Sequence, residues 1–191
     1  MKTEREKMIA GEYYIAGHPD LRKDRTNAKK LLHRLNITEY RVTKKARKII
    51  AELIPNTGEN FYIEPPFFCD YGYNINCGDN VYFNVNCVIL DCAPINIGSN
   101  VMLAPNVQIY TATHPLDAET RKTLHFAEGV TIGDDCWIGG NSVICPGVTI
   151  GNGCVIGAGS VVTKDIPDNS LAVGNPAKVI RKLNQESENN N

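Results

Sequence analysis

The chain has 191 residues and a formal net charge of −1, and this length favours one compact domain with a small addition. Charged residues make up 21% and hydrophobic residues 42% of the sequence, which argues against wholesale disorder. No apolar stretch approaches the roughly 20 residues of a membrane span, and the polar start MKTEREKM is unlike a signal peptide. We therefore expect a globular protein with no membrane partner. Its 19 Ile and 14 Val against 11 Leu favour strands over helices.

The beginning of the chain differs from the remainder in charge and pattern. Residues 1–54 carry 14 Lys or Arg against 7 Asp or Glu, whereas residues 55–191 carry 6 against 14. A helix with Asp20 as its N-terminal cap is predicted by apolar residues at helical spacing, namely Leu21, Ala28, Leu31, Leu32 and Leu35. The basic residues would lie on solvated helix faces without interleaved aromatic residues, which argues against nucleic acid as a partner. We predict that residues 1–56 form a small helical cap.

A six-residue period dominates the rest of the chain. One large aliphatic residue recurs in the run Ile132, Ile138, Ile144, Ile150, Ile156 and Val162, with a small residue two positions before each. The same period runs upstream between Cys77 and Ile109. Eleven positions that lie three residues after a large residue hold Asn, Asp or Gly, which tolerate positive φ: Asn74, Asn80, Asn86, Asn100, Asn106, Asp135, Asn141, Gly147, Gly153, Gly159 and Asp165.

Such a unit is a short strand followed by a bend, and three units make an 18-residue coil. Stacked coils pair their strands in parallel, so we predict a mainly β fold over residues 57–175, a parallel β-helix with the shape of a triangular prism. The chain has seven cysteines and no CxxC motif, which favours neither a disulfide framework nor a zinc finger. Five fall in inward columns as small hydrophobes, Cys69, Cys77, Cys87, Cys136 and Cys154, and we expect a reducing cytoplasm.

The period is interrupted in two places, and interruptions of a solenoid often carry its site. A two-residue bulge lies around Asp91–Pro94. A long excursion at residues 110–129 reads YTATHPLDAETRKTLHFAEG and contains His114 and His125. After the prism, the segment PAKVIRKL with Pro176 at its start predicts a helix, so residues 176–191 are expected to form a C-terminal helix and tail.

The sequence resembles the hexapeptide-repeat acetyltransferases, specifically their maltose and galactoside O-acetyltransferase group. The resemblance covers nearly the whole chain and includes MIAGEYY, CDYGYNINCGDNVYFNVNCVILD, LAPNVQIYTATHPLD, DDCWIGGNSVICPGVTIG, VIGAGSVVTKDIP and AVGNPAKVIRKL. It implies a left-handed coil and a homotrimer with sites between subunits. It also implies transfer of acetyl from acetyl-CoA to a sugar hydroxyl, directly in a ternary complex and without a metal.

A histidine is well matched to proton abstraction near neutral pH, so we expect His114, on the excursion that should overhang the prism, to be the general base, with His125 of the same loop as the second candidate. The resemblance places Asn84 beside the reacting groups. Asp70 and Asp91 lie in blocks that resemble the sugar-binding edge of the family. Cys92 and Ala16 stand where galactoside enzymes have acidic residues, which favours maltose or glucose as the acceptor.

For the cofactor, the resemblance implies an oxyanion donor at the Gly140 N–H. It also implies contacts to CoA from Trp137, Ala158, Thr163 and Lys164. Only six cations follow residue 54, and four of them lie near the C-terminus: Lys164, Lys178, Arg181 and Lys182. We expect Lys164, Lys178 and Arg181 to bind the phosphates of CoA.

Other readings stay open at this point. The same prism serves acyltransferases that act on a galactoside, an amino sugar or a xenobiotic. A prism-type zinc carbonic anhydrase needs three converging histidines, and the body of this chain offers only His114 and His125. The sequence leaves open the physiological acceptor, the biological role of the acetylation, the group that orients His114, and the roles of Cys92 and Cys145.

Overall fold

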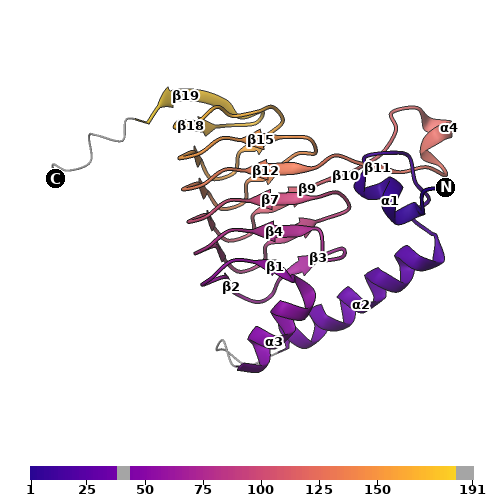
Figure 1. The fold of residues 1–191 in the computed structure, drawn as a ribbon. Coiled ribbons are helices and arrows are strands. Elements are labelled where there is room, and N and C mark those ends of the chain that lie inside the picture. Colours follow the sequence, from indigo (N-terminus) through magenta and orange to yellow (C-terminus); the bar gives the residue numbers. More distant parts are fainter. Residues whose placement is uncertain (38–43, 184–191) are drawn as a thin grey trace.

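Short parallel strands stack into three walls in the structure, a computed structural model that describes residues 1–37 and 44–183 (Figure 1). The chain adds one strand to each wall in turn, so a coil contributes to the first, the second and then the third wall. About six such turns form the solenoid. The predicted mainly β fold, a parallel β-helix of hexapeptides, is thereby confirmed.

The bounds of the strands follow the six-residue period. The first wall contains β1 (Asn56–Thr57), β4 (Ile75–Cys77), β7 (Ile95–Ile97), β12 (Val130–Ile132) and β15 (Thr149–Ile150). The second wall contains β2 (Tyr62–Ile63), β5 (Tyr82–Phe83), β8 (Met102–Leu103), β13 (Trp137–Ile138), β16 (Val155–Ile156), β18 (Ser170–Val173) and β19 (Lys178–Lys182). The third wall contains β3 (Phe68–Cys69), β6 (Val88–Leu90), β9 (Gln108–Tyr110), β14 (Val143–Ile144) and β17 (Val161–Val162).

The inward columns form one continuous apolar core. All six large residues of the late coils are buried: Ile132, Ile138, Ile144, Ile150, Ile156 and Val162. All seven cysteines are free thiols. Cys69, Cys87, Cys136 and Cys154 are buried as expected, and Cys77 is partly buried. Cys92, which lies off the inward columns, is also buried, in a second cluster with residues of the helical cap.

Nine of the eleven predicted corner residues have positive φ: Asn80, Asn86, Asn100, Asn106, Asp135, Asn141, Gly147, Gly153 and Gly159. The prediction was wrong at Asn74 and Asp165. Asn74 is buried beside the bulge, where its Nδ2 donates to the Asp91 main-chain oxygen at 2.7 Å, and Gly72 takes the positive φ instead. Asp165 uses its Oδ1 to accept a hydrogen bond from the Thr149 N–H at 2.7 Å.

A ladder of side chains fixes the corner between the first and second walls. Each member accepts a backbone N–H from the preceding coil at 2.7–3.1 Å, and the members are Asp79, Ser99, Asp134, Asn152 and Asp168. The close approach needs glycine beside it, because a Cβ on Gly98 would lie 2.2 Å from Asp134 Oδ1. The ladder satisfies corner N–H groups that no strand partner reaches.

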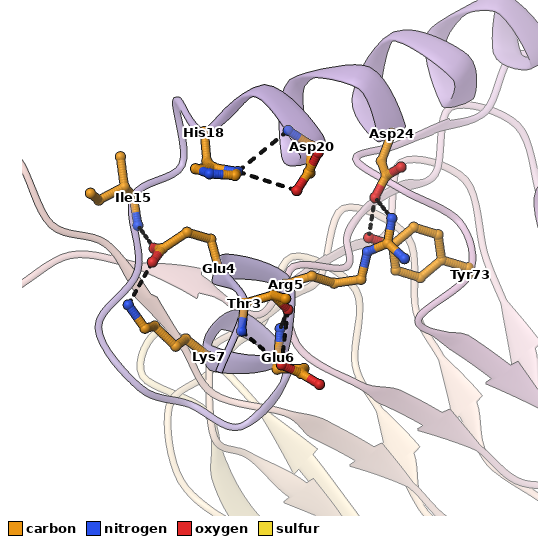
Figure 2. Close-up of polar contacts among 10 residues, drawn as sticks. All are labelled: Thr3, Glu4, Arg5, Glu6, Lys7, Ile15, His18, Asp20, Asp24 and Tyr73. Atoms are coloured by element: carbon orange, nitrogen blue, oxygen red, sulfur yellow. Dashed lines mark hydrogen bonds and ion pairs between the residues drawn. The ribbon is translucent and has the colours of Figure 1, made fainter. Parts of the chain in front are cut away.

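The described residues before the solenoid form the helices α1 (Glu4–Ile9), α2 (Pro19–Asn36) and α3 (Lys44–Leu53). Figure 2 shows Thr3 and Glu6 capping α1 reciprocally, and His18 Nδ1 accepting the Asp20 N–H at 3.4 Å. The second helix therefore begins at Pro19, with His18 rather than Asp20 as its cap.

The helical cap packs against the first coils. Buried residues of α2 and α3 join the solenoid core, among them Leu32, Leu35 and Ile49. Asn36 pairs with the main chain of Phe67 through both its amide atoms at 2.9 Å. No helix in the described ranges is long and apolar enough to cross a membrane.

The C-terminal helix predicted for residues 176–191 was wrong where the structure describes it. The chain turns through Gly174, whose φ is +104°, and returns as β19 antiparallel to β18. Ser170–Val173 would otherwise end the second wall with unpaired backbone groups, and the β-branched pair Val179 and Ile180 suits a strand that covers this edge. The tail from residue 184 onward lies outside the described residues.

The long excursion is an ordered arm. After β9, β10 (Ala112–Thr113) pairs antiparallel with β11 (Phe126–Ala127), and the short helix α4 (Ala118–Arg121) lies between them. Asp117 caps α4 by accepting the Thr120 N–H at 2.7 Å. The arm extends beside α1 at the far end of the cap (Figure 1).

Candidate active site

The predicted site residues fall on two corners of the prism, one at each side of the third wall. We call the corner between the second and third walls the second–third edge, with residues 84–86, 104–106, 139–141 and 157–159. We call the corner after the third wall the third–first edge, with residues 70–74, 91–94, 111–129 and 163–165. Wall order alone fixes this division, because each strand of the third wall begins at one edge and ends at the other.

His114 follows β10 on the arm, at the third–first edge, and its side chain is exposed. Its ring faces that of His125, with centroids 4.7 Å apart and planes inclined by 57°. Burial, and then the neighbouring His114 and Arg25, lower the pKa of His125. Its Nδ1 is enclosed and has no hydrogen-bond partner among the residues described. The arm therefore brings its two histidines together.

The helical cap holds this arm in place. Tyr14 and His125 form an isolated antiparallel bridge, in which the Tyr14 N–H donates to the His125 carbonyl oxygen at 2.9 Å and the His125 N–H donates to the Tyr14 carbonyl oxygen at 3.0 Å. Met8 of α1 and Ala127 of β11 are buried in the same cluster. Tyr13 meets Phe126 edge to face at 5.7 Å between centroids.

Asp91 lies at the third–first edge but is fully buried. Its Oδ1 accepts the Asp70 and Tyr71 N–H groups at 3.0 and 2.8 Å, and its Oδ2 accepts those of Gly72 and Asn74 at 2.7 and 3.3 Å. Burial outweighs these bonds and raises the pKa of the carboxyl to about 7. This geometry suits a residue that holds the 70–74 turn, and it does not fit the expected direct contact with a sugar.

Asp70 sits at the surface of that turn. The Cys92 thiol donates to its Oδ2 at 3.4 Å, and the Tyr14 hydroxyl in turn bonds to Cys92. Burial raises the pKa of Cys92 to about 12, so this cysteine stays a neutral thiol. Close by, Arg25 donates to the Tyr71 hydroxyl at 2.6 Å. Asp70 is thus oriented from behind by a buried thiol and a buried tyrosine.

The second–third edge presents a column of backbone groups. The Val85 N–H is taken up by Asn84 Oδ1 at 2.8 Å, and Pro105 has no N–H. The next two positions up the column, Gly140 and Ala158, have N–H groups without an acceptor in the part of the chain that the structure describes. Two free donors in line at one edge can receive an oxyanion and an amide carbonyl.

Trp137 and the cations of β19 lie on the second wall next to this column. Trp137 is 50% exposed and pairs in register with Val155, which pairs with Leu171, which pairs with Arg181. Three strand spacings, about 14 Å, therefore separate the indole from Arg181 along one row. Lys178 is also exposed on β19.

The structure thus brings together some predicted residues and separates others. Asn84, Trp137, Gly140, Ala158, Lys178 and Arg181 belong to the second–third edge or the wall beside it. Asp70, His114, Thr163 and Lys164 belong to the third–first edge. Within one chain the whole third wall separates His114 from Asn84. Among the described residues, no group of three or more His, Cys, Asp or Glu side chains converges as a metal site.

Sequence reasoning missed the roles of Tyr14 and Arg25, which line the back of the third–first edge. Both come from the cap and reach the edge only through tertiary packing. The adjacent tyrosines at 13 and 14, one exposed and one buried, carried no recognisable periodic signal.

Comparison with known proteins agrees with this architecture. Residues 7–58 match the maltose acetyltransferase hexapeptide capping motif, and residues 129–164 match the bacterial transferase hexapeptide with six repeats. A protein of Dictyostelium discoideum, provisionally named an acetyltransferase, is 50% identical over 187 residues, which is 97% of each chain.

Solved structures extend the likeness to the whole fold. A maltose O-acetyltransferase from Clostridium difficile 630 has a TM-score of 0.94 and 49% identity, covering 96% of this chain and 99% of the other. A galactoside acetyltransferase in complex with coenzyme A has a TM-score of 0.92 and 40% identity over 96% and 92%. A hexapeptide-repeat acetyltransferase of Vibrio cholerae O1 biovar eltor, complexed with acetyl coenzyme A, has a TM-score of 0.89 and 38% identity over 96% and 100%.

The chain belongs to the hexapeptide-repeat acetyltransferases, in the group of the maltose and galactoside O-acetyltransferases. It is accordingly an acetyltransferase.

Proposed function

We propose that the protein transfers acetyl from acetyl-CoA to a hydroxyl of a sugar such as maltose or glucose. The transfer is direct, in a ternary complex, with His114 as the general base. The site lies between two copies of the chain in a homotrimer. A reducing cytoplasm suits its seven free thiols.

The division of the site residues between two edges carries this proposal. A three-sided prism whose third wall faces a threefold axis brings the second–third edge of one copy against the third–first edge of the next. His114 of one copy then meets Asn84 and Gly140 of its neighbour, and the ring closes with three equivalent sites. The outward side chains of the third wall support such a contact, since Phe68 is 47% exposed and Val88, Val143 and Val161 are partly exposed.

The chemistry uses the groups at each edge. His114 takes the proton of the acceptor hydroxyl while that oxygen attacks the thioester carbonyl carbon. The carbonyl oxygen becomes an oxyanion that accepts a hydrogen bond from the Gly140 N–H. When the intermediate collapses, the C–S bond breaks, and the imidazolium returns its proton to the CoA sulfur. Asn84 Nδ2, which has no acceptor in the described part of the chain, orients the hydroxyl or the acetyl carbonyl.

Acetyl-CoA is the co-substrate in this proposal. Two of the similar solved structures carry coenzyme A or its acetyl form, which supports the same ligand here. The Ala158 N–H suits the pantetheine amide, and the exposed Trp137 lines the arm. Lys178 and Arg181 on β19, with Thr163 and Lys164 of the adjoining copy, bind the nucleotide end and its phosphates.

The acceptor binds at the third–first edge beside His114. Asp70 accepts hydrogen bonds from sugar hydroxyls, and Asp91 acts behind it by holding the turn. The neighbour named a maltose O-acetyltransferase supports a glucose-type acceptor. Cys92, a buried neutral thiol, offers no carboxylate to a galactoside at this place.

An acceptor screen tests the proposal. The purified protein is incubated with acetyl-CoA and maltose, glucose, isopropyl thiogalactoside, glucosamine or chloramphenicol, and release of the CoA thiol is measured. We expect maltose or glucose to give the highest kcat/KM. A preference for glucosamine or chloramphenicol would show that the acceptor is an amino sugar or a xenobiotic rather than maltose or glucose. Zinc-dependent CO2 hydration without acetyl transfer would show that the protein is a carbonic anhydrase rather than an acetyltransferase.

A further inference from the structure

His125 lies beside the proposed base, and the mechanism above leaves it unused. The ring of His114 lies against the ring of His125, with 4.7 Å between the centroids. Its side chain has no hydrogen bond or ion pair with any other residue in the described ranges. A general base is normally oriented by a third group, so the group that orients His114 has to be sought in this contact.

Contacts with Tyr14 hold both the main chain and the ring of His125 in place. Both of its main-chain groups are bonded to Tyr14, and its ring lies against the Tyr14 ring at 5.9 Å between centroids. Tyr14 is itself 3% exposed. The His125 ring therefore has a fixed place between a buried tyrosine and the exposed His114.

The surroundings of His125 favour its neutral form. A charged imidazole donates from both nitrogens, and the enclosed Nδ1 finds no acceptor among the described residues. The charged groups that face it are Arg25 from α2 and His114 from the arm, and both lower the pKa of His125. Tyr14, from the segment after α1, is neutral because burial raises its pKa. The enclosed Nδ1 and the neighbouring positive charge thus keep the His125 ring neutral beside His114.

We propose that His125 is a positioning residue for His114: its neutral ring fixes the plane of the base and faces the positive charge that the base gains in the reaction. The inference rests on the proposed function, in which His114 takes the acceptor proton. A cation within about 6 Å of an aromatic ring is stabilised by the ring electrons. This stabilisation grows as the imidazolium forms, so it acts on the rate rather than on cofactor binding.

Two substitutions at position 125 separate the ring from the imidazole. His125→Phe keeps an aromatic face, and His125→Leu fills the space without one. We expect His125→Leu to lower kcat about five- to tenfold and to move the acid limb of the kcat/KM profile to lower pH. We expect His125→Phe to stay within about twofold of the parent in kcat, with the limb unmoved. The KM for acetyl-CoA should change in neither variant.

The control is His33→Leu, which alters an exposed histidine of α2 outside the site. If His125→Leu does not fold, His125→Gln takes its place, since it also lacks a ring. Parental kcat in the ringless variant would overturn the inference. An equal loss of kcat in the folded Phe variant would overturn it as well.

A second readout needs no turnover. The imidazole resonances of His114 are followed by NMR against pH in the parent protein, His125→Phe and His125→Leu. We expect the Phe variant to follow the parent and the Leu variant to depart from both. Identical titrations in all three would refute the ring pairing. A parent protein that acetylates no acceptor would instead refute the proposed function, while this titration still decides the role of His125.

Discussion

Tyr14 and His125 exchange both of their main-chain hydrogen bonds, at 2.9 and 3.0 Å, and so join the helical cap to the arm that carries His114. The cap thereby supports the candidate site, because among the described residues the arm pairs antiparallel only within its own hairpin and through this bridge. Tyr14 lies within residues 7–58, which match the capping motif.

Removal of the base should abolish most of the turnover. We expect His114→Ala to lower kcat about 100-fold or more, the scale of a lost general base, while the dissociation constant for CoA stays nearly the same. Steady-state kinetics and calorimetric titration with CoA measure the two quantities. His33→Ala serves as the matched control, and an unchanged rate in His114→Ala would reject the assignment.

The cations that we propose bind the CoA phosphates should affect the KM for acetyl-CoA more than the KM for the sugar. Replacing Lys164 and Arg181 together by Ala is expected to raise the KM for acetyl-CoA severalfold and more than the KM for the sugar, because each charged hydrogen bond to phosphate contributes about 1.5–3 kcal/mol. Lys23→Ala with Lys30→Ala, on the exposed face of α2, removes the same charge elsewhere. A larger effect on the sugar would move the cofactor away from these residues.

The contact between copies should depend on the third wall. We expect Phe68→Asp to disperse the proposed trimer and to abolish activity, because it places a charge in an apolar contact. Light scattering gives the mass of the assembly. Thr131→Asp, on the exposed surface of the first wall, should leave the trimer intact. A trimer that survives Phe68→Asp at micromolar concentration would point to another wall.

Asp91 should make stability depend on pH. Burial raises its pKa from 3.8 to about 7, so the folded protein binds a proton that the unfolded chain has released between these values. The carboxyl's contribution to the free energy of unfolding is therefore present in full below about pH 4 and falls as pH rises, by at most about 1.4 kcal/mol per unit.

The comparison is made with Asp91→Asn, which does not titrate. Urea unfolding at pH 4.5, 5.5 and 6.5 and fixed protein concentration gives both free energies. We expect the parent to lose stability relative to the variant as pH increases. A difference that is constant across this range would contradict the raised pKa.

At corner positions with positive φ, glycine should be tolerated better than alanine. Asn106 has a φ of 60°, and we expect Asn106→Ala to cost about 1–2 kcal/mol of unfolding free energy. Asn106→Gly should cost much less, because glycine adopts this conformation without strain. Denaturant melts of the two variants decide the point, and equal losses would mean that the amide rather than the backbone matters.

The regular part of the fold could be predicted because it is local. The role of each corner asparagine and each inward aliphatic residue is set by its position within its own six-residue unit. The period alone was therefore enough to locate the walls and the arm. The failures lie where distant residues decide. Lys178–Lys182 form a strand because β18 leaves an edge to cover, and Asp91 is buried because four backbone N–H groups converge on it.

The sequence predicts the candidate site as a set of residues, but it does not predict how these residues divide between two edges of one chain. That division depends on which wall each strand joins. Counting six-residue units assigns strands to walls only after the lengths of the bulge and the excursion have been taken into account. The pairing of His114 with His125 also escaped prediction, because it depends on the twist of a hairpin and on a tyrosine from the cap.

Both ends of the coil stack are closed, by α2 and α3 below and by the β18–β19 hairpin above. Parallel coils with in-register strands would otherwise add to those of another molecule, end upon end, and grow into a filament. Because both ends are closed, copies can associate only through their walls. Such contacts can form a closed assembly with a fixed number of copies.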